Sequence, residues 1–415
     1  PYSVGRGATV TSDESPAADA LNPAASGLNQ RVTLDVGYAA LAGLGESVSG
    51  IGGHVLNLGG ILPTRAGVLT SSLHYLTSDY DEVELGSTFG LNLSFAKALY
   101  PNLLIGIGGN LYLGGAAGTV ETGVTADIGL LHVPGRSYGL RNLRVALVLQ
   151  ELGKWYRPIP ERSGLPSPFT PRAGIAFDPV DTEEIHVGVY SDAALPTFRN
   201  LRVSLGGVAT FQDVFSIYGG FRLDARQLID PTIANRSLIP SFGVSINFDT
   251  NFQDESSFIG RQGWNRSEVR TRAAAAPLYG GVWALSTGAN IPLGVIDSAP
   301  PEIAVGYKDV IYISPNNDGV SDDVSLDVSI RDQRYLQGFE FRIEDSQGNI
   351  VRLIENKEER PETEGFQNVL DRLFAVETGI EAPDRLRWDG TADTGGIVED
   401  GDYRMFVSAW DDKGN

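Results

Sequence analysis

The chain has 415 residues, no cysteine and a formal net charge of −20. The lack of cysteine excludes disulfide scaffolds, thiolate metal sites and cysteine nucleophiles. The acidic balance argues against nucleic acid as a partner. The first residue is a proline and only one methionine is present, so we expect an exported protein whose signal peptide has been removed.

The charged residues divide the chain into two regions. Residues 299–415 hold 26 of the 52 acidic and 12 of the 32 basic side chains, whereas only two lysines, Lys97 and Lys154, precede residue 300. The second region resembles a solvated acidic domain, and the first is poor in charge for a soluble domain. Two adjacent prolines, Pro300 and Pro301, indicate a linker at 298–301.

The first region alternates between apolar and small polar residues almost throughout. In one example, Phe242, Val244, Ile246 and Phe248 alternate with Gly243, Ser245 and Asn247. A period of two places the two sets on opposite faces of a sheet. A soluble sandwich or barrel is one interpretation. The polar face carries Gly, Ser, Asn and Thr rather than Lys and Glu, which favours a strand wall facing lipid.

About fourteen strands are predicted, and an even number suits a closed antiparallel barrel with both termini on one side. Closure would satisfy every backbone group within lipid. The first region is thus predicted to be an all-β, outer-membrane β-barrel. The predicted spans are 31–41, 49–58, 65–77, 84–96, 102–114, 120–133, 142–152, 171–178, 184–191, 200–211, 214–225, 240–249, 267–278 and 282–292.

The lengths of the connections give an orientation. If the first strand starts in the periplasm, the long connections 153–170 and 226–239 face outside, as expected for extracellular loops. The connection 250–266 breaks this pattern, because it is long and falls on the periplasmic side. Either the strand count is wrong there, or this segment has a role of its own.

Residues 5–28 do not alternate. Ser15 followed by Pro16 predicts a helix start, and Asn22 before Pro23 predicts its end after about two turns. A segment rich in Gly and Ala ahead of the first strand is predicted to fold into the lumen as a hatch. The predicted organisation is therefore a hatch at 1–28, a barrel at 29–297, a linker at 298–301 and a second domain at 302–415.

The motif Ala20-Leu21-Asn22-Pro23-Ala24-Ala25, followed by a barrel strand, resembles the FadL-like outer-membrane transporters and especially their PorV-like and spirochaetal relatives. The resemblance covers about residues 5–295 and implies a fourteen-stranded barrel with an N-terminal hatch. Hatch or lumen positions are assigned to Asp19, Asn22, Pro23, Ala24, Asp35 and Arg222.

Two functions follow from this resemblance. FadL-like members imply uptake or passage of hydrophobic small molecules. PorV-like members imply a scaffold or anchor subunit of an envelope or secretion assembly that transports nothing. The loops are shorter than those of the transporters. The expected partners are outer-membrane lipid, a hydrophobic ligand and envelope proteins.

Residues 302–415 alternate short strands with turns, which predicts an immunoglobulin-like sandwich. Strands are expected at Val310–Ile313, 324–330, 338–344, 350–354, 386–388 and 403–410, with a short helix at Gln367–Phe374. The segments 313–323, 387–390 and 400–403 resemble FlgD-type and gliding-associated domains, which implies an interaction module. The chain ends where such domains form a last strand, which suggests truncation there. An even strand count places this domain in the periplasm.

One candidate metal site and no enzymatic site emerge. Asn316, Asp318, Asp322 and Asp323 resemble a calcium loop, although an Asx-stabilised turn is the alternative. No other cofactor is expected. The four histidines are scattered over different predicted strands, and no serine has the spacing of a nucleophile beside one of them. We therefore expect a protein that is not an enzyme.

Overall fold

The computed structural model divides into two compact units, 1–295 and 296–415, and each is described by itself. The residues that the structure describes are 2–13, 18–44, 49–80, 83–116, 119–137, 139–154, 169–229, 239–251, 264, 266–278, 281–294, 300–306, 310–332, 336–359, 365–376 and 378–411.

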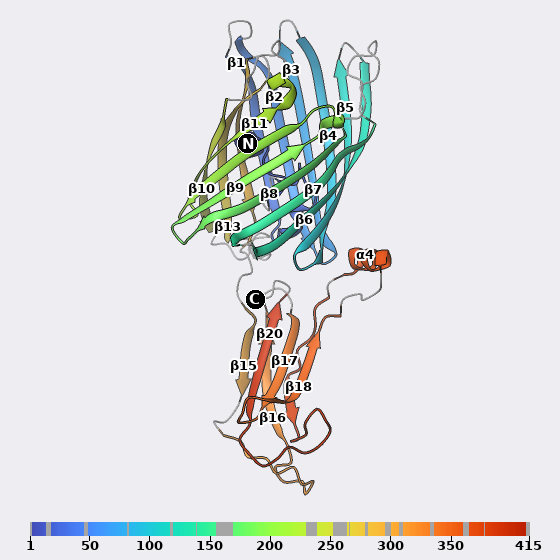
Figure 1. The fold of residues 1–415 in the computed structure, drawn as a ribbon, viewed down its shortest axis with the longest axis vertical. Helices are drawn as coiled ribbons and strands as arrows, with labels where there is room; N and C mark the ends of the chain where they lie inside the picture. Colours follow the sequence, from blue (N-terminus) through green and yellow to red (C-terminus); the bar gives the residue numbers. More distant parts are fainter. Residues whose placement is uncertain are drawn as a thin grey trace. The chain divides into compact units, whose positions relative to one another are not determined.

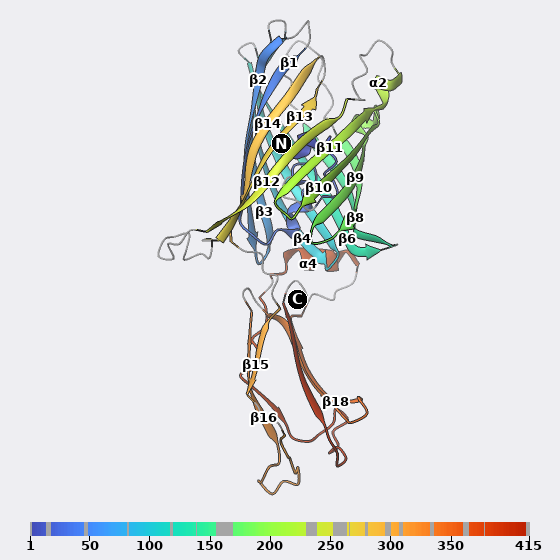
Figure 2. The ribbon, with the colours of Figure 1, turned by 90° about the vertical axis from the view of Figure 1, so that its left-hand side faces the viewer.

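Fourteen strands of the first unit form a closed antiparallel barrel (Figures 1 and 2). Each strand pairs with its neighbours in sequence, and β1 closes the barrel on β14 with Thr33 opposite Pro292. The predicted count and architecture are confirmed. The strands are β1 (Thr33–Leu44), β2 (Ser49–Thr64), β3 (Gly67–Tyr80), β4 (Val83–Tyr100), β5 (Leu103–Ala116), β6 (Thr119–Ser137), β7 (Leu140–Lys154), β8 (Thr170–Asp181), β9 (Ile185–Ala194), β10 (Arg202–Phe211), β11 (Phe215–Asp224), β12 (Ser241–Asn251), β13 (Arg266–Pro277) and β14 (Val282–Pro292).

The barrel is apolar outside and polar inside. On β12, Phe242 is 58% exposed and Val244 is 43% exposed, whereas Ser241 and Ser245 are buried. A soluble sandwich would bury the apolar set instead, so that interpretation is wrong. An apolar outer face on a closed sheet matches the hydrocarbon of a bilayer, and the barrel is a transmembrane one.

The pairing also resolves the doubtful end of the barrel. β12 pairs with both β11 and β13, and β13 pairs with β14. The segment between β12 and β13 is therefore a true connection, at the barrel end where β1 begins. Residues 252–263 and 265 of this segment lie outside the described residues, as do 155–168 and 230–238 of the two connections expected outside.

Short helical turns complete the first unit: α1 (Tyr2–Gly5), η2 (Ala25–Leu28), η3 (Pro196–Phe198) and α2 (Ala225–Ile229). No helix among the described residues is long and apolar enough to cross a membrane. The start of the helix predicted from Ser15 lies outside the described residues. From Ala18 onward the chain makes a single turn, in which the N–H groups of Leu21 and Asn22 both donate to the Ala18 carbonyl.

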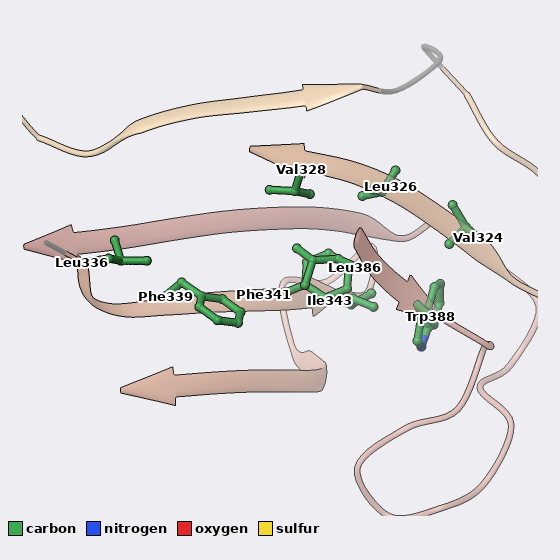
Figure 3. Packing of buried hydrophobic residues seen from close by; sticks show 9 residues of the cluster. All are labelled: Val324, Leu326, Val328, Leu336, Phe339, Phe341, Ile343, Leu386 and Trp388. Atoms are coloured by element: carbon green, nitrogen blue, oxygen red, sulfur yellow. The ribbon is translucent and has the colours of Figure 1, made fainter. Parts of the chain in front are cut away.

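The second unit contains two three-stranded sheets, one ordered β15-β16-β19 and the other β18-β17-β20. Buried residues from both sheets, including Leu326, Phe341 and Trp388, share one core (Figure 3). The two sheets thus form a sandwich, while its relation to FlgD-type domains stays a prediction. The elements are β15 (Glu302–Gly306), β16 (Val324–Arg331), β17 (Leu336–Glu344), β18 (Ile350–Lys357), α4 (Gly365–Phe374), β19 (Arg385–Trp388) and β20 (Arg404–Asp411).

One predicted strand of this unit is wrong and the predicted helix is confirmed. Val310–Ile313 does not form a strand, and Tyr312 is 85% exposed. Both edges of β16 are already occupied, by β15 and β19, so this sheet offers no place beside β16 for that segment. The helix expected at Gln367–Phe374 is present as α4.

Candidate functional site: a plugged lumen

The N-terminal residues 2–13 and 18–28, here called the plug, lie inside the barrel (Figures 1 and 2). Arg6, Val10 and Asn22 are fully buried although they precede the first strand. The helix α1 packs against β11, β12 and β13, and η2 packs against β3, β4 and β5. The plug therefore touches opposite parts of the wall and occupies the lumen.

Glycines on the inward face of the wall make room for the plug. A Cβ atom at Gly129 would lie 2.0 Å from the side-chain oxygen of Asn22, and one at Gly106 would lie 2.2 Å from the carbonyl carbon of Pro23. On the β11 side, a Cβ at Gly220 would lie 2.4 Å from the Arg6 carbonyl oxygen. Main-chain contact this close is possible only at glycine.

Asn22 ties two parts of the plug to each other and to β6. Its Nδ2 donates to the Thr11 carbonyl at 2.9 Å and to the Leu130 carbonyl at 3.3 Å. Its Oδ1 accepts from the Ala24 N–H at 3.0 Å. All these groups are buried or half-buried, so losing the amide would leave unpaired polar groups in the lumen.

Pro23 and Ala24 complete this contact. The Pro23 main chain lies against Gly106, and Ala24 packs in a small apolar cluster with Leu104 and Leu131. The predicted hatch motif thus lies at one place, where the plug meets β5 and β6.

Asp19 is a buried carboxyl of the plug whose pKa is strongly shifted. It is 7% exposed and accepts a hydrogen bond from the Ser94 hydroxyl of β4 at 3.0 Å. Burial raises the pKa of Asp19 to about 7, a rise that the hydroxyls of Ser26 and Ser94 oppose and the negative charge of Asp127 adds to. Near neutral pH this carboxyl therefore lies close to its titration point.

Charged groups that the sequence did not single out hold the other half of the plug. Arg6 forms an ion pair with Asp13 at 2.5 Å, and its guanidinium lies 3.4 Å from the ring centre of Tyr190 on β9. An ion pair closed within the plug, beside an aromatic face, compensates the burial of that arginine.

Asp192 of β9 binds the plug directly. Its carboxylate accepts from both the N–H and the hydroxyl of Thr11. Arg172 of β8 approaches Asp192 at 3.6 Å and donates to the Ala8 carbonyl at 3.4 Å. This pair therefore clamps residues 8–11, and no motif in the sequence pointed to it.

The two predicted wall residues lie on inward faces but away from this clamp. Asp35 of β1 accepts from Asn290 Nδ2 at 3.1 Å. Arg222 of β11 is repelled by the charges of Arg202 and Arg172 and attracted by that of Asp224. Among the described residues, no hydrogen bond joins Asp35 or Arg222 to the plug.

An apolar groove of about 500 Å³ lies on the membrane-facing side of the wall, over β12, β13, β14 and β1. Its large outward side chains are Tyr38, Phe242, Val244 and Leu285, and Ala273 and Ala275 lie between them. The inward residue Ala274 also borders the groove. The Ala274 methyl would lie 3.0 Å from a Cβ on Gly5 of α1, and the Tyr218 ring lies beside Gly5 and Gly243 on the same inward side.

The proposed calcium loop of the second unit uses its oxygens internally. Asp322 accepts from the N–H groups of Asn316, Asn317 and Gly319 at 2.8–3.2 Å. Asp318 accepts from Val320 at 2.8 Å and Asp323 pairs with Arg387. These bonds are those of an Asx-stabilised turn. In the described part of the chain, no group of three or more His, Asp or Glu residues could hold a metal ion. Calcium binding stays a prediction.

Fold and site together define a plugged transmembrane β-barrel of the outer-membrane type. No protein-family model and no curated protein matches the sequence. Among solved structures, the chain is similar to the toluene transporter TbuX of Ralstonia pickettii, with 11% identity and a TM-score of 0.44 over 70% of this chain and 96% of that one.

Two further structures are similar. They are the toluene transporter TodX of Pseudomonas putida, with 12% identity and a TM-score of 0.40 over 70% of this chain and 95% of that one, and a FadL homologue of Pseudomonas aeruginosa, with 11% identity and a TM-score of 0.38 over 70% and 96%. The assignment of the fold rests on the strand pairing and apolar exterior of this chain.

Proposed function

We propose that this barrel passes hydrophobic small molecules across the outer membrane, as its resemblance to the FadL-like transporters implies. The observation that carries the proposal is the apolar groove on the membrane-facing wall, separated from α1 of the plug by Ala274. A plug that occupies the lumen suits a gated passage better than an open water channel. An apolar groove on this wall can hold an apolar solute out of contact with water between the plug and the lipid.

The proposal is tested by filling the groove. Ala275→Phe places a ring between Phe242 and Leu285, its register partners on β12 and β14. Ala209→Phe on β10, where Ala209 lies opposite the outward Ile217, is the matched control. Uptake of a radiolabelled long-chain alkane by intact cells should fall several-fold in the first variant and not in the second. Equal uptake in both variants would contradict a passage through this groove.

The alternative is a PorV-like scaffold or anchor subunit. The observation that favours it is the firm attachment of the plug through buried polar groups, including Arg6, Asp13 and Asp192. A scaffold predicts that a partner from the envelope co-purifies with the intact chain and that Ala275→Phe changes neither this partner nor alkane uptake.

We place the second unit in the periplasm under both functions. An even number of strands returns the chain to the end of the barrel where β1 begins, and short connections such as 65–66 and 101–102 lie at that end. Its acidic surface would keep the unit soluble there.

A further inference from the structure

The second unit carries an apolar helix face that its own core does not cover. In α4, Phe366, Val369, Leu370, Leu373 and Phe374 follow the spacing that places residues on one side of a helix. None of the ten residues of α4 is buried against the described parts of the chain, and Phe366 and Phe374 are 73% and 77% exposed. Two exposed phenylalanines on one short helix mark an interaction surface.

The opposite side of α4 is polar and bonded along the helix. Gln367 donates to Asp371 at 2.7 Å, and the Arg372 side chain donates to Asn368 at 2.8 Å. These bonds join residues four apart and stabilise the helix without tertiary packing. The apolar side is therefore presented by a helix that supports its own shape.

The loop that carries α4 is fixed at its base. One carboxylate oxygen of Glu358 accepts from the N–H groups of Thr378 and Gly379. The N–H of Glu358 donates to the Gln337 carbonyl, and that of Ile380 donates to the Leu336 carbonyl, each at 2.9 Å. Both ends of the loop are thus joined to each other and to the start of β17.

This base lies at the end of the sandwich that the chain enters from the barrel. β15 begins at Glu302, which pairs with Arg331 at the end of β16. The chain then turns into β17 at Leu336, so Glu302 and the base of the loop share one end of the unit. Figure 2 shows α4 at the same end of this unit as the first residues of β15. The chain from Pro292 of the barrel to Glu302 spans at most about 35 Å.

We propose that α4 docks on a phospholipid surface. This surface is the membrane leaflet at the rim of the barrel where β1 begins and β14 ends. An amphipathic helix with aromatic and aliphatic residues on one face binds in the plane of the membrane interface. The short tether keeps the local concentration of that surface high for this end of the unit. The inference concerns the second unit alone and stands independently of what passes through the barrel.

Apolar burial, and not charge, drives this docking. Residues 358–364 carry four glutamates and one arginine, which disfavours attraction to anionic lipid. Docking should therefore need no excess of phosphatidylglycerol and should change little with salt. Each phenylalanine that leaves water contributes about a tenfold change in the docking equilibrium.

The lack of cysteine in the chain permits a direct test with the full-length protein in proteoliposomes. Three single variants are labelled with a fluorophore: Val369→Cys on the apolar side of α4, Gln367→Cys on its polar side, and Ser346→Cys in the turn at the opposite end of β17. Lipids with a nitroxide on the acyl chain quench only nearby fluorophores. We expect strong quenching at position 369, weaker quenching at 367 and none at 346.

Replacing both Phe366 and Phe374 with serine in the Val369→Cys variant should reduce quenching to the level at position 346. Circular dichroism and unchanged fluorescence at Ser346→Cys check that the unit is still folded. Absence of quenching at position 369 overturns the proposal. Quenching at position 369 that appears only after the protein is diluted with lipid also overturns it, because the apolar face then prefers a second copy of the chain to lipid.

Discussion

Single inward residues decide whether the plug fits the wall. Gly129 leaves room for the side chain of Asn22, and a Cβ atom there would lie 2.0 Å from its oxygen. Gly129→Val should therefore displace the Asn22 turn, at a cost of about 1–3 kcal/mol for overpacking, and raise conductance in planar bilayers. Gly108→Ala is the control, because Gly108 also faces inward and the nearest contact of a Cβ there, at 3.6 Å, is an ordinary one. Equal conductance of the two variants would show that this contact does not hold the plug.

Asp19 makes plug docking depend on pH. Burial raises its pKa to about 7 in the docked plug, against 3.8 for a solvated aspartate. The docked state thus holds the proton more tightly, and docking is strongest below about pH 4. The equilibrium constant for plug docking falls by at most about tenfold per pH unit as the pH rises from about 4 to about 7, and it then levels off. Conductance should increase over this range.

Asp19→Asn keeps a neutral group beside Ser94 and should remove most of this pH dependence. Because the asparagine cannot titrate, any change of conductance with pH that remains in this variant belongs to other groups. A pH profile of conductance identical to that of the unaltered chain would assign the titration elsewhere.

At this scale the sequence predicted part of the site. Asn22, Pro23 and Ala24 stood out because Asn-Pro is a local turn signal. Asp192 and Arg172 did not, because they meet Thr11 and Ala8 across more than 160 residues of sequence. Only the closed barrel brings such residues together, and no local pattern encodes the contact.

At the scale of elements, the plug is a separable part of the barrel. The plug contacts only the inward faces of the strands. The strands pair with each other around the closed barrel and do not need the plug for that pairing. Deleting residues 5–25 should therefore leave the barrel folded and open the lumen, with a several-fold rise in conductance. Heat-dependent mobility on gels checks that the barrel is intact. Unchanged conductance with a folded barrel would show that the plug does not close the lumen.

The strands were predictable because each one carries its own signal. Alternation of apolar and small residues recurs in every strand, and the predicted spans fall within a few residues of those observed. β2, β4 and β6 are exceptions that run four to six residues past their predicted ends, since inter-strand pairing extends strands beyond the alternating core. Val310–Ile313 has a local signal too, but both edges of β16 are already occupied by β15 and β19, and local propensity yields to tertiary pairing.

At the scale of the whole molecule, the outward face of the barrel requires lipid or detergent. Leu58, Leu93 and Leu147 are each more than half exposed on different strands. A surface this apolar associates in water. The intact chain should stay monodisperse only above the critical micelle concentration of a detergent, as size-exclusion chromatography can measure. A monodisperse monomer without detergent would contradict a membrane location.

The ends of the barrel decide on which side of the membrane the second unit lies. β1 begins and β14 ends at the same rim of the barrel, because Thr33 pairs with Pro292. Whatever the orientation of the barrel, the plug and the second unit therefore enter from one side. Except for the long connection between β12 and β13, the connections at this rim are short, as periplasmic turns are, so we expect the second unit in the periplasm.

Protease treatment of whole cells separates the two orientations. The helix α4 contains Arg372, which is followed by Leu373, so trypsin should cut there once it reaches the unit. In intact cells this cleavage should not occur, and it should appear after the outer membrane is made permeable. Cleavage in intact cells would reverse the orientation, and connections 155–168 and 230–238 would then face the periplasm. The docking of α4 would then take place on the outer leaflet. The protease experiment therefore also decides which leaflet α4 can reach.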